Sequence, residues 1–341
     1  MYIIEYIQQE NISNIMMEWH FLERGEEMTY FQTYEWYEML IKFTPRCKAI
    51  DSVYALVRDV NGVPMMIAPL WIVKYDYRYV NKCGVYFIGR KDCTDYLNFI
   101  YKEFIPGVCD FLLKSLYEKY ALKRYCFEQI LESTSSYTYL IHQGNKIREE
   151  VCAHLVLPDS FERYKDLLSK NTRKNLRLAY NRLKTDGKDI KVVCDDENAD
   201  MERCSYIRNA RLRKKNSYQV SFLNKIKSYI YKKLAISFPE CVQHQEDKNA
   251  HILSVYCDGL LQMFFCYGID ALHRKVVLMT AGVEEQFARY SLGVIGLYEF
   301  IQYLIEQGKI DEIDFLRGGE HYKYALGGVN HTIADVEIIL N

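Results

Sequence analysis

A dense group of ionisable side chains lies near the end of the chain. Asp314, Arg317, Glu320, His321, Tyr322 and Lys323 fall within ten positions, directly after an apolar, strand-like run. A carboxylate can accept a proton from a reacting group, and a tyrosine or lysine can stabilise the charge that develops. We therefore predict catalytic residues in this stretch. An ion pair of Arg317 with Asp314 or Glu320 would instead only fasten the loop, and for Asp314 and Arg317 both interpretations stay open.

A second candidate is the turn of Tyr290, Ser291, Leu292, Gly293 and Val294, which follows a predicted strand and opens an apolar helix. Backbone N–H groups at the start of a helix have no partner within the helix. Together with the helix dipole they attract phosphate. The position of the turn predicts a site for the phosphates of a cofactor. The alternative is a simple N-cap, in which the Ser291 hydroxyl accepts a hydrogen bond from the first turn.

The third candidate is a basic helix. Between positions 163 and 188, nine lysines and arginines stand against two aspartates. Cations three or four positions apart share one helix face. Such a face suits an anionic partner, and two asparagines among the cations add hydrogen-bonding groups, although a solvated helix face has the same pattern. The residues predicted to bind the substrate here are Lys170, Arg173, Asn175 and Arg177.

Two further candidates lie in the first half of the chain, where Asp95 and Tyr96 follow a short predicted strand. Polar groups at a strand end can face a binding cleft, so both are predicted to bind the substrate. Elsewhere, the sequence lacks the motifs GxxxxGK[ST], HExxH, GxSxG and GxGxxG. Nucleotide hydrolysis, zinc-dependent proteolysis and serine hydrolysis are therefore disfavoured.

These candidates depend on an order of elements that occurs twice. In each half, two apolar runs flank a glycine turn, Asn61-Gly62 or Asp258-Gly259, which predicts a β-hairpin. A third strand, a helix and a fourth strand follow in both halves, so the pattern predicts two α/β lobes, at 1–150 and 151–341. The predicted segments are 52–59, 63–73, 85–88, 104–120 and 124–131 in the first lobe, and 252–257, 260–267, 275–280, 293–307 and 310–316 in the second.

Composition limits the classes of protein. The chain has 341 residues, enough for two modest domains, and its net charge of −1 argues against a general binder of polyanions. Its 11 cysteines form no CxxC pair, which predicts reduced thiols and no metal site. Neither a secretory signal nor a run of 18 apolar residues occurs, so we expect a cytoplasmic protein without a transmembrane segment.

A resemblance to a known family rests on five stretches: FQTYEWYEML (31–40), DYLNF (95–99), LSKNTRKNLRLAYNRL (168–183), YSLGVIGLYEFI (290–301) and DFLRGGEHYKYALGG (314–328). They are similar to the acyltransferases associated with cellulose and exopolysaccharide biosynthesis, which belong to the GNAT superfamily near the FemABX peptidyltransferases. The resemblance implies an α/β (α+β) fold of two tandem GNAT-like lobes, each a mixed, mostly antiparallel sheet flanked by helices. It also places acetyl-CoA or another acyl-CoA in the C-terminal lobe, with Ser291–Val294 at the pyrophosphate, and matches Lys323 to a FemABX lysine.

The resulting hypothesis is direct acyl transfer to an amine, such as an amino sugar or a surface-polysaccharide precursor. Glu320 or Asp314 would remove a proton from the amine, and backbone N–H groups of a splayed second-lobe strand would polarise the thioester carbonyl. Tyr290 or Tyr322 would protonate the departing thiolate, and no covalent intermediate is expected. Two alternatives stay open: aminoacyl transfer from charged tRNA, which the basic helix favours, and a non-catalytic module that kept the fold.

Overall fold

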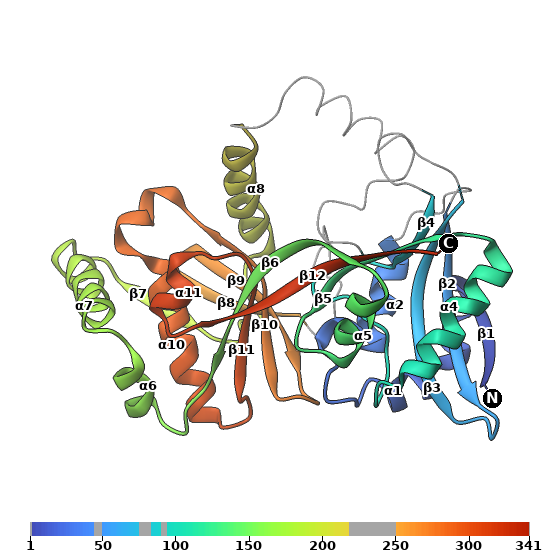
Figure 1. Cartoon of the computed structure of the whole chain (residues 1–341). Coiled ribbons are helices and arrows are strands. Elements are labelled where there is room, and N and C mark those ends of the chain that lie inside the picture. Colours follow the sequence, from blue (N-terminus) through green and yellow to red (C-terminus); the bar gives the residue numbers. More distant parts are fainter. Residues whose placement is uncertain (1, 44–49, 75–82, 90–93, 218–249, 341) are drawn as a thin grey trace. The chain divides into compact units, whose positions relative to one another are not determined.

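The computed structural model describes residues 2–43, 50–74, 83–89, 94–217 and 250–340 (Figure 1). The described residues divide into two compact units. The first contains residues 2–151 and 331–340, and the second contains 152–217 and 250–330. Among the described residues, no helix is both long and apolar enough to cross a membrane.

The first unit is built on a sheet whose strands are hydrogen-bonded in the order β1-β2-β3-β4-β5-β12. Only the β4–β5 pair is parallel, and helix α4 provides the crossover that a parallel pair requires. The strands are β1 (Tyr2–Gln8), β2 (Ile50–Asp59), β3 (Pro64–Val73), β4 (Gly84–Phe87), β5 (Arg124–Leu131) and β12 (Val329–Ile339). The helices are α1 (Met16–Leu22), α2 (Tyr34–Phe43), α4 (Pro106–Tyr120) and α5 (Ser135–Gln143).

The second unit repeats this plan, with strand order β6-β11-β10-β9-β8-β7 and a single parallel pair, β10–β11, joined through helix α10. The strands are β6 (Asn145–Val156), β7 (Ile190–Val193), β8 (Ala250–Cys257), β9 (Leu260–Asp270), β10 (Lys275–Val283) and β11 (Glu312–Arg317). The helices are α6 (Phe161–Leu167), α7 (Lys170–Thr185), α8 (Met201–Ser217), the 3₁₀ helix η4 (Glu285–Tyr290), α10 (Leu292–Gln307) and α11 (His321–Ala325).

Both predicted hairpins are present, β2–β3 and β8–β9. Asp258 and Gly259 have φ angles of 53° and 78°, the left-handed pair that a two-residue type I′ turn requires. Gly62, with φ of 84°, closes the longer loop of the first hairpin. The predicted third strand, helix and fourth strand also occur in each unit, so the predicted fold class of two mixed, mostly antiparallel lobes flanked by helices is confirmed.

The strand that closes each sheet is not the one that comes next along the chain. β6 follows β5 along the chain, yet its residues Cys152–Val156 pair with β11 in the second unit. β12 follows β11, yet Ile333–Ile339 pair with β5 in the first unit (Figure 1). The sequence-based division assigned all of 151–341 to the second lobe, whereas the residues from 331 onward belong to the first unit. Local hydrophobic patterns could not reveal this exchange, because they do not encode which strand pairs with which.

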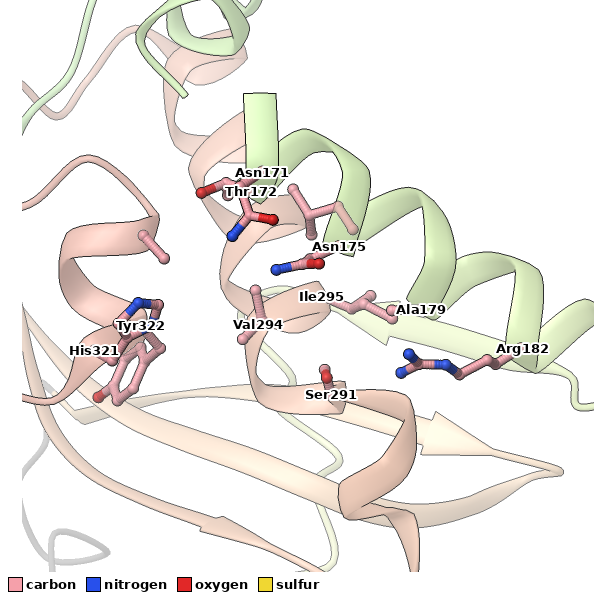
Figure 2. A pocket seen from close by; sticks show the side chains of 12 residues that line it. Asn171, Thr172, Asn175, Ala179, Arg182, Ser291, Val294, Ile295, His321 and Tyr322 are labelled. Carbon is pink, nitrogen blue, oxygen red and sulfur yellow. The ribbon is translucent and has the colours of Figure 1, made fainter. Parts of the chain in front are cut away.

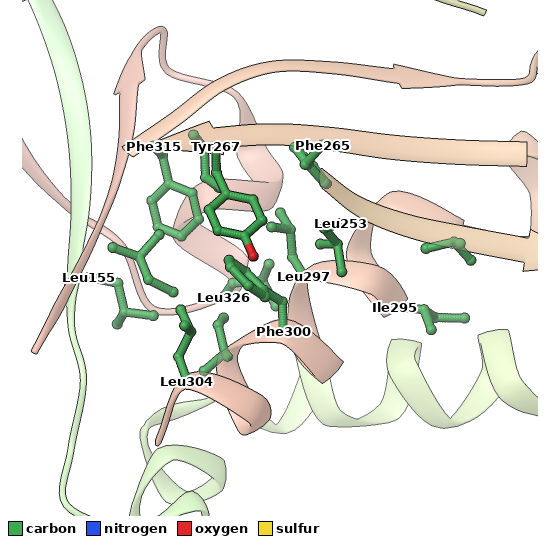
Figure 3. Packing of buried hydrophobic residues seen from close by; sticks show 14 of the residues in the cluster. Leu155, Leu253, Phe265, Tyr267, Ile295, Leu297, Phe300, Leu304, Phe315 and Leu326 are labelled. Atoms are coloured by element: carbon green, nitrogen blue, oxygen red, sulfur yellow. The ribbon is translucent and has the colours of Figure 1, made fainter. Parts of the chain in front are cut away.

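Both faces of the second sheet are covered, which explains the almost unbroken apolar run of β9. Alternate side chains of a strand point to opposite faces. Met263, Phe265 and Tyr267 pack into the core beneath α10, together with Phe300 (Figure 3). On the other face, Phe264 and Cys266 pack against α8 through Cys204 and Ile207. Leu261 joins them because the β8–β9 register shifts between Val255 and Tyr256.

Helix α10 lies close to the sheet at one glycine. A Cβ atom on Gly296 would lie 2.7 Å from Cγ2 of Val255 on β8. On the same helix, a Cβ atom on Gly293 would come no nearer than 3.9 Å, to the terminal methyl of Met263. Gly296 is therefore required by the packing distance, whereas Gly293 is not.

We predict that Gly296→Ala destabilises the fold by about 1–3 kcal/mol, because the added methyl overpacks a buried contact. Gly293→Ala is the matched control, and we expect it to be neutral or stabilising by up to about 1 kcal/mol, since alanine favours the helix. Urea unfolding followed by circular dichroism measures both free energies. Equal stability of the two variants would contradict the proposed contact.

Candidate functional site

The two parallel strands of the second unit part halfway along their length. β10 and β11 pair only from Lys275 and Glu312 to Val277 and Asp314. β10 then carries an irregularity between Leu278 and Thr280 and continues beside β9 as far as Val283. β11 leaves the regular register with β6 between Asp314 and Arg317. The edges of the parting strands are therefore the predicted splayed region.

Asp314 stabilises the bend at the end of β11. Its side chain is 6% exposed, and its Oδ1 accepts a hydrogen bond from the backbone N–H of Leu316 at 2.7 Å. Leu316 has a φ of 57° and Gly318 a φ of 107°, so the backbone turns sharply here. A non-glycine residue in the left-handed region costs about 1–3 kcal/mol and needs such local support. Asp314 thus has a structural partner within the turn.

Lys323 stabilises the same turn through hydrogen bonds. Its side chain is 2% exposed, and its Nζ donates to the backbone carbonyls of Leu316, Arg317 and Gly318 at 3.1, 2.8 and 2.9 Å. The Glu320 carboxylate lies 2.9 Å from the same Nζ. An ammonium group has three donors, so the three carbonyls can use all of them and the Glu320 carboxylate adds an ion pair. Lys323 therefore anchors the segment from β11 to α11.

A pocket of about 200 Å³ opens between α7, the start of α10 and α11, all within the second unit (Figure 2). Three helices from separate parts of the sequence contribute to it. No acidic side chain is among the described residues that line it. The lining residues are Asn171, Thr172, Asn175, Leu176, Ala179, Arg182, Ser291, Val294, Ile295, His321, Tyr322 and Ala325.

Helix α7 presents amides rather than its basic row to this pocket. Thr172, Leu176, Ala179 and Leu183 form the buried face that packs on the unit. Beside that face, the predicted Asn175 lines the pocket. The predicted cations of the helix are exposed and lie outside the lining: Lys170, Arg173, which is 3.9 Å from Asp166, and Arg177.

The turn before α10 provides the backbone donors. Ser291 adopts a left-handed conformation, with φ of 55°, and its side chain makes no capping hydrogen bond, so the simple N-cap interpretation is wrong. Its carbonyl accepts from the N–H groups of Val294 and Ile295. Within the described residues, the N–H groups of Leu292 and Gly293 have no such acceptor. Leu292 is fully buried, whereas Gly293 is partly exposed. The N–H of Gly293, at the positive end of a 16-residue helix, is therefore available to an anion.

Tyr290 is tied into the surroundings of the turn. Its ring is 4% exposed, and its hydroxyl donates to Oδ2 of Asp186 at 2.7 Å. This hydrogen bond and the nearby Arg289 hold the pKa of the Asp186 carboxyl below its usual value. Of the predicted turn residues, Ser291 and Val294 line the pocket, whereas Tyr290, Leu292 and Gly293 do not.

Helix α11 brings two side chains to the pocket. Tyr322 was predicted to be catalytic, whereas His321 belongs to the ionisable stretch but was assigned no role. Asp314, Arg317, Glu320 and Lys323 are outside the lining. The five-residue helix starts immediately after Glu320, so the anchored turn positions both pocket residues. The dense ionisable stretch thus combines residues that shape the turn with residues that face the pocket.

Asp95 and Tyr96 lie in the first unit and do not line this pocket. Both are buried, at 8% and 2% exposure. Tyr96 has a φ of 52°, and its hydroxyl lies 2.7 Å from Nε2 of His331. Its carbonyl accepts a hydrogen bond from the Gln32 side chain. These contacts give Tyr96 a role in the packing of the first unit.

Sequence reasoning missed Arg182 and His321. Arg182 lies seven positions after Asn175 and eleven after Asn171, so the helical period places all three on one side of α7. This spacing could have predicted that Arg182 belongs with the asparagines, but the cations at 170–177 form the more conspicuous pattern. His321 lies in the dense ionisable stretch, but nothing in the sequence distinguishes it from its neighbours there, since its position depends on the turn that Lys323 anchors.

Comparison with known proteins finds a family that the second half of the chain resembles. Residues 170–324 match the family described as "Acetyltransferase (GNAT) domain". The described residues of this match all lie in the second unit. The match begins with α7 and ends within α11, at residue 324, so it includes every lining residue except Ala325. No curated protein matches the chain in sequence.

Solved structures extend the likeness to the whole chain. FemX has a TM-score of 0.63 at 11% identity, covering 99% of this chain and 98% of that one. A tandem GNAT protein from the clavulanic acid biosynthesis pathway has a TM-score of 0.52 at 9% identity, covering 99% and 98%. The C-terminal domain (DUF2156) of a lysylphosphatidylglycerol synthetase from Agrobacterium fabrum has 0.54 at 11% identity, covering 97% and 93%. At these identities the likeness is one of fold, and it agrees with two GNAT-type lobes.

We predict that Lys323→Met destabilises the protein by about 2–3 kcal/mol, because three backbone carbonyls lose their shared donor. The control is Lys275→Met, which removes a partly exposed ion pair of 3.1 Å with Glu312 and should cost less than about 1 kcal/mol. Chemical denaturation gives both values. If the two variants lose the same stability, Lys323 is not the anchor of this turn.

Proposed function

We propose that the chain is an acyl-CoA-dependent N-acyltransferase that transfers an acetyl group to an amine, such as that of an amino sugar or a surface-polysaccharide precursor. The observation that carries the proposal is the pocket of the second unit. It joins the N-terminus of α10, a natural phosphate site, to a tyrosine and a histidine that can move protons. The GNAT match over the same segments supports it.

In this proposal the donor's pyrophosphate lies at the start of α10, where the N–H group of Gly293 has no backbone acceptor in the described chain. The rest of the donor runs toward α11 along the parting strands β10 and β11. Backbone N–H groups at that edge would polarise the thioester carbonyl, as the sequence suggested. Because the pocket lining contains no acidic side chain, the negative charge of the donor meets no direct repulsion there.

The chemical step is attack of the amine nitrogen on the thioester carbonyl carbon. The new C–N bond forms, the C–S bond breaks, the nitrogen loses a proton and the thiolate gains one. Tyr322 is the proposed donor to the thiolate, because it lines the pocket whereas Tyr290 is held by Asp186. His321 is the proposed acceptor of the amine proton, since Asp314 and Glu320 are engaged by Leu316 and Lys323 outside the lining.

A second candidate is aminoacyl transfer from charged tRNA. The exposed cations Lys170, Arg173 and Arg177 on the outer side of α7 favour it, since such a row can follow a phosphate backbone. The likeness to FemX is in fold only. A steep loss of tRNA affinity between low and moderate salt would support this candidate, because released counterions make phosphate contacts strongly salt-dependent.

We predict that titration calorimetry shows micromolar binding of acetyl-CoA and of coenzyme A. Gly293→Trp should weaken this binding at least ten-fold, which corresponds to a loss of about 1.4 kcal/mol of binding free energy. The indole would block the donors at the start of α10. Gly293→Ala is the control, since its Cβ has room, and it should bind within about two-fold of the native protein. Failure of the native protein to bind either ligand would reject acyl-CoA as the donor.

We predict that Tyr322→Phe lowers turnover by about 10²-fold or more, with unchanged coenzyme A affinity, because the hydroxyl acts only on the departing thiolate. Thiol release from acetyl-CoA, with glucosamine as the acceptor probe, measures turnover. Tyr324→Phe, on the same short helix but outside the pocket lining, should retain activity. A fully active Tyr322→Phe would remove this tyrosine from the mechanism.

A further inference from the structure

The pocket contains a cation that was not among the predicted site residues. Arg182 lies near the end of α7 and lines the pocket together with Ser291 (Figure 2). It is the one lysine or arginine among the lining residues that the structure describes. Its guanidinium therefore determines the charge of this part of the pocket.

The guanidinium of Arg182 is oriented by one hydrogen bond, which uses only part of its donors. Its NH1 donates to the backbone carbonyl of Arg289 at 3.0 Å, directly before the turn that opens α10. A guanidinium has five N–H donors in a rigid fork. Within the described chain, the remaining donors of Arg182 have no protein acceptor. A carbonyl neutralises no charge, so the cation is held in place with its charge uncompensated.

The other cation near the turn is compensated. Arg289 donates to the Asp186 carboxylate and, at 2.7 Å, to the hydroxyl of Tyr290. Its guanidinium also lies over the Tyr290 ring, 4.7 Å from the centroid. Asp186, whose pKa is lowered by the Tyr290 hydrogen bond and by Arg289, remains ionised and balances it. Of these two arginines, only Arg182 can offer an unbalanced charge to a ligand.

We propose that Arg182 is a specificity-determining residue that selects a donor bearing a phosphate or diphosphate at the start of α10. This inference rests on the proposed function, because it assigns the donor's anionic group to the same pocket. Charge-assisted bonds from a guanidinium fork to phosphate are strong and directional. Arg182, reaching in from another helix, thus supplies the cation that the sequence of the turn itself lacks.

The test compares coenzyme A with pantetheine, which has the same arm without phosphates, by titration calorimetry. Arg182→Gln should weaken coenzyme A binding about ten-fold or more, the loss expected for a hydrogen bond to a charged group. Pantetheine affinity should not change, which also shows that the pocket is intact. Arg182→Lys should lie between, since it keeps the charge but loses the fork.

The matched control is Lys184→Gln, which removes the same charge two positions away, on an exposed side of α7 outside the pocket lining. It should bind coenzyme A within about two-fold of the native protein, because exposed charges at a distance are screened. If Arg182→Gln also binds within two-fold, the inference is wrong although the proposed function stands. An equal loss of coenzyme A and pantetheine would overturn it as well, since Arg182 would then only maintain the fold.

Inorganic pyrophosphate separates the two proposals, with phosphorus NMR as the readout. If coenzyme A does not bind but pyrophosphate does, and Arg182→Gln weakens it, the phosphate site stands while the acyl-CoA donor is rejected. If the native protein binds neither ligand, both proposals fail. Binding of pyrophosphate that is equal in the native protein and in Arg182→Gln would reject Arg182 as the phosphate-selecting residue.

Discussion

A buried ammonium group organises the reactive end of the second unit. Lys323 gathers the carbonyls of Leu316, Arg317 and Gly318, which all point inward because the chain leaves β11 in a left-handed turn. Without a shared donor, these carbonyls would lose their hydrogen bonds in a poorly hydrated interior. The direction of α11 follows from this contact, and with it the positions of His321 and Tyr322 at the pocket. A single side chain thus sets the geometry of several others.

The pocket differs from the core in how its polar groups are satisfied. The amides of Asn171 and Asn175 and the imidazole of His321 line it without a hydrogen-bonding partner in the described chain. The neighbouring core is closely packed with aromatic and aliphatic side chains, as around Tyr267 and Phe300. Polar groups left without internal partners at a concave surface are typical of ligand sites. Their concentration at three helix segments distinguishes this region from a solvated helix face.

The sequence predicted the elements well, because hairpin turns and hydrophobic runs are local. Asp258-Gly259 and Asn61-Gly62 predict turns because glycine favours the left-handed backbone conformations found there. The site was only partly predictable. Tyr322, Ser291, Val294 and Asn175 line the pocket, but the structural engagement of Lys323 depends on a backbone turn that side-chain types do not reveal.

Arg182 shows a different limit. The row of cations on α7 predicted substrate binding by Lys170, Arg173 and Arg177, which are exposed and lie outside the pocket lining. A charge pattern identifies a helix face but not its neighbour, and the neighbour here is set by the packing of Leu176, Ala179 and Leu183 on the unit. Prediction of the pocket therefore required the orientation of the helix, which only the tertiary structure provides.

The exchange of closing strands has a consequence for biosynthesis of the chain. The first sheet needs β12, whose paired residues end at Ile339, although its other strands are complete by Leu131. A ribosome therefore releases most of the first unit long before the strand that covers its β5 edge exists. Unpaired strand edges are templates for association with other chains. The nascent first unit thus passes through a stage with an open edge, which is closed only after β12 has been synthesised.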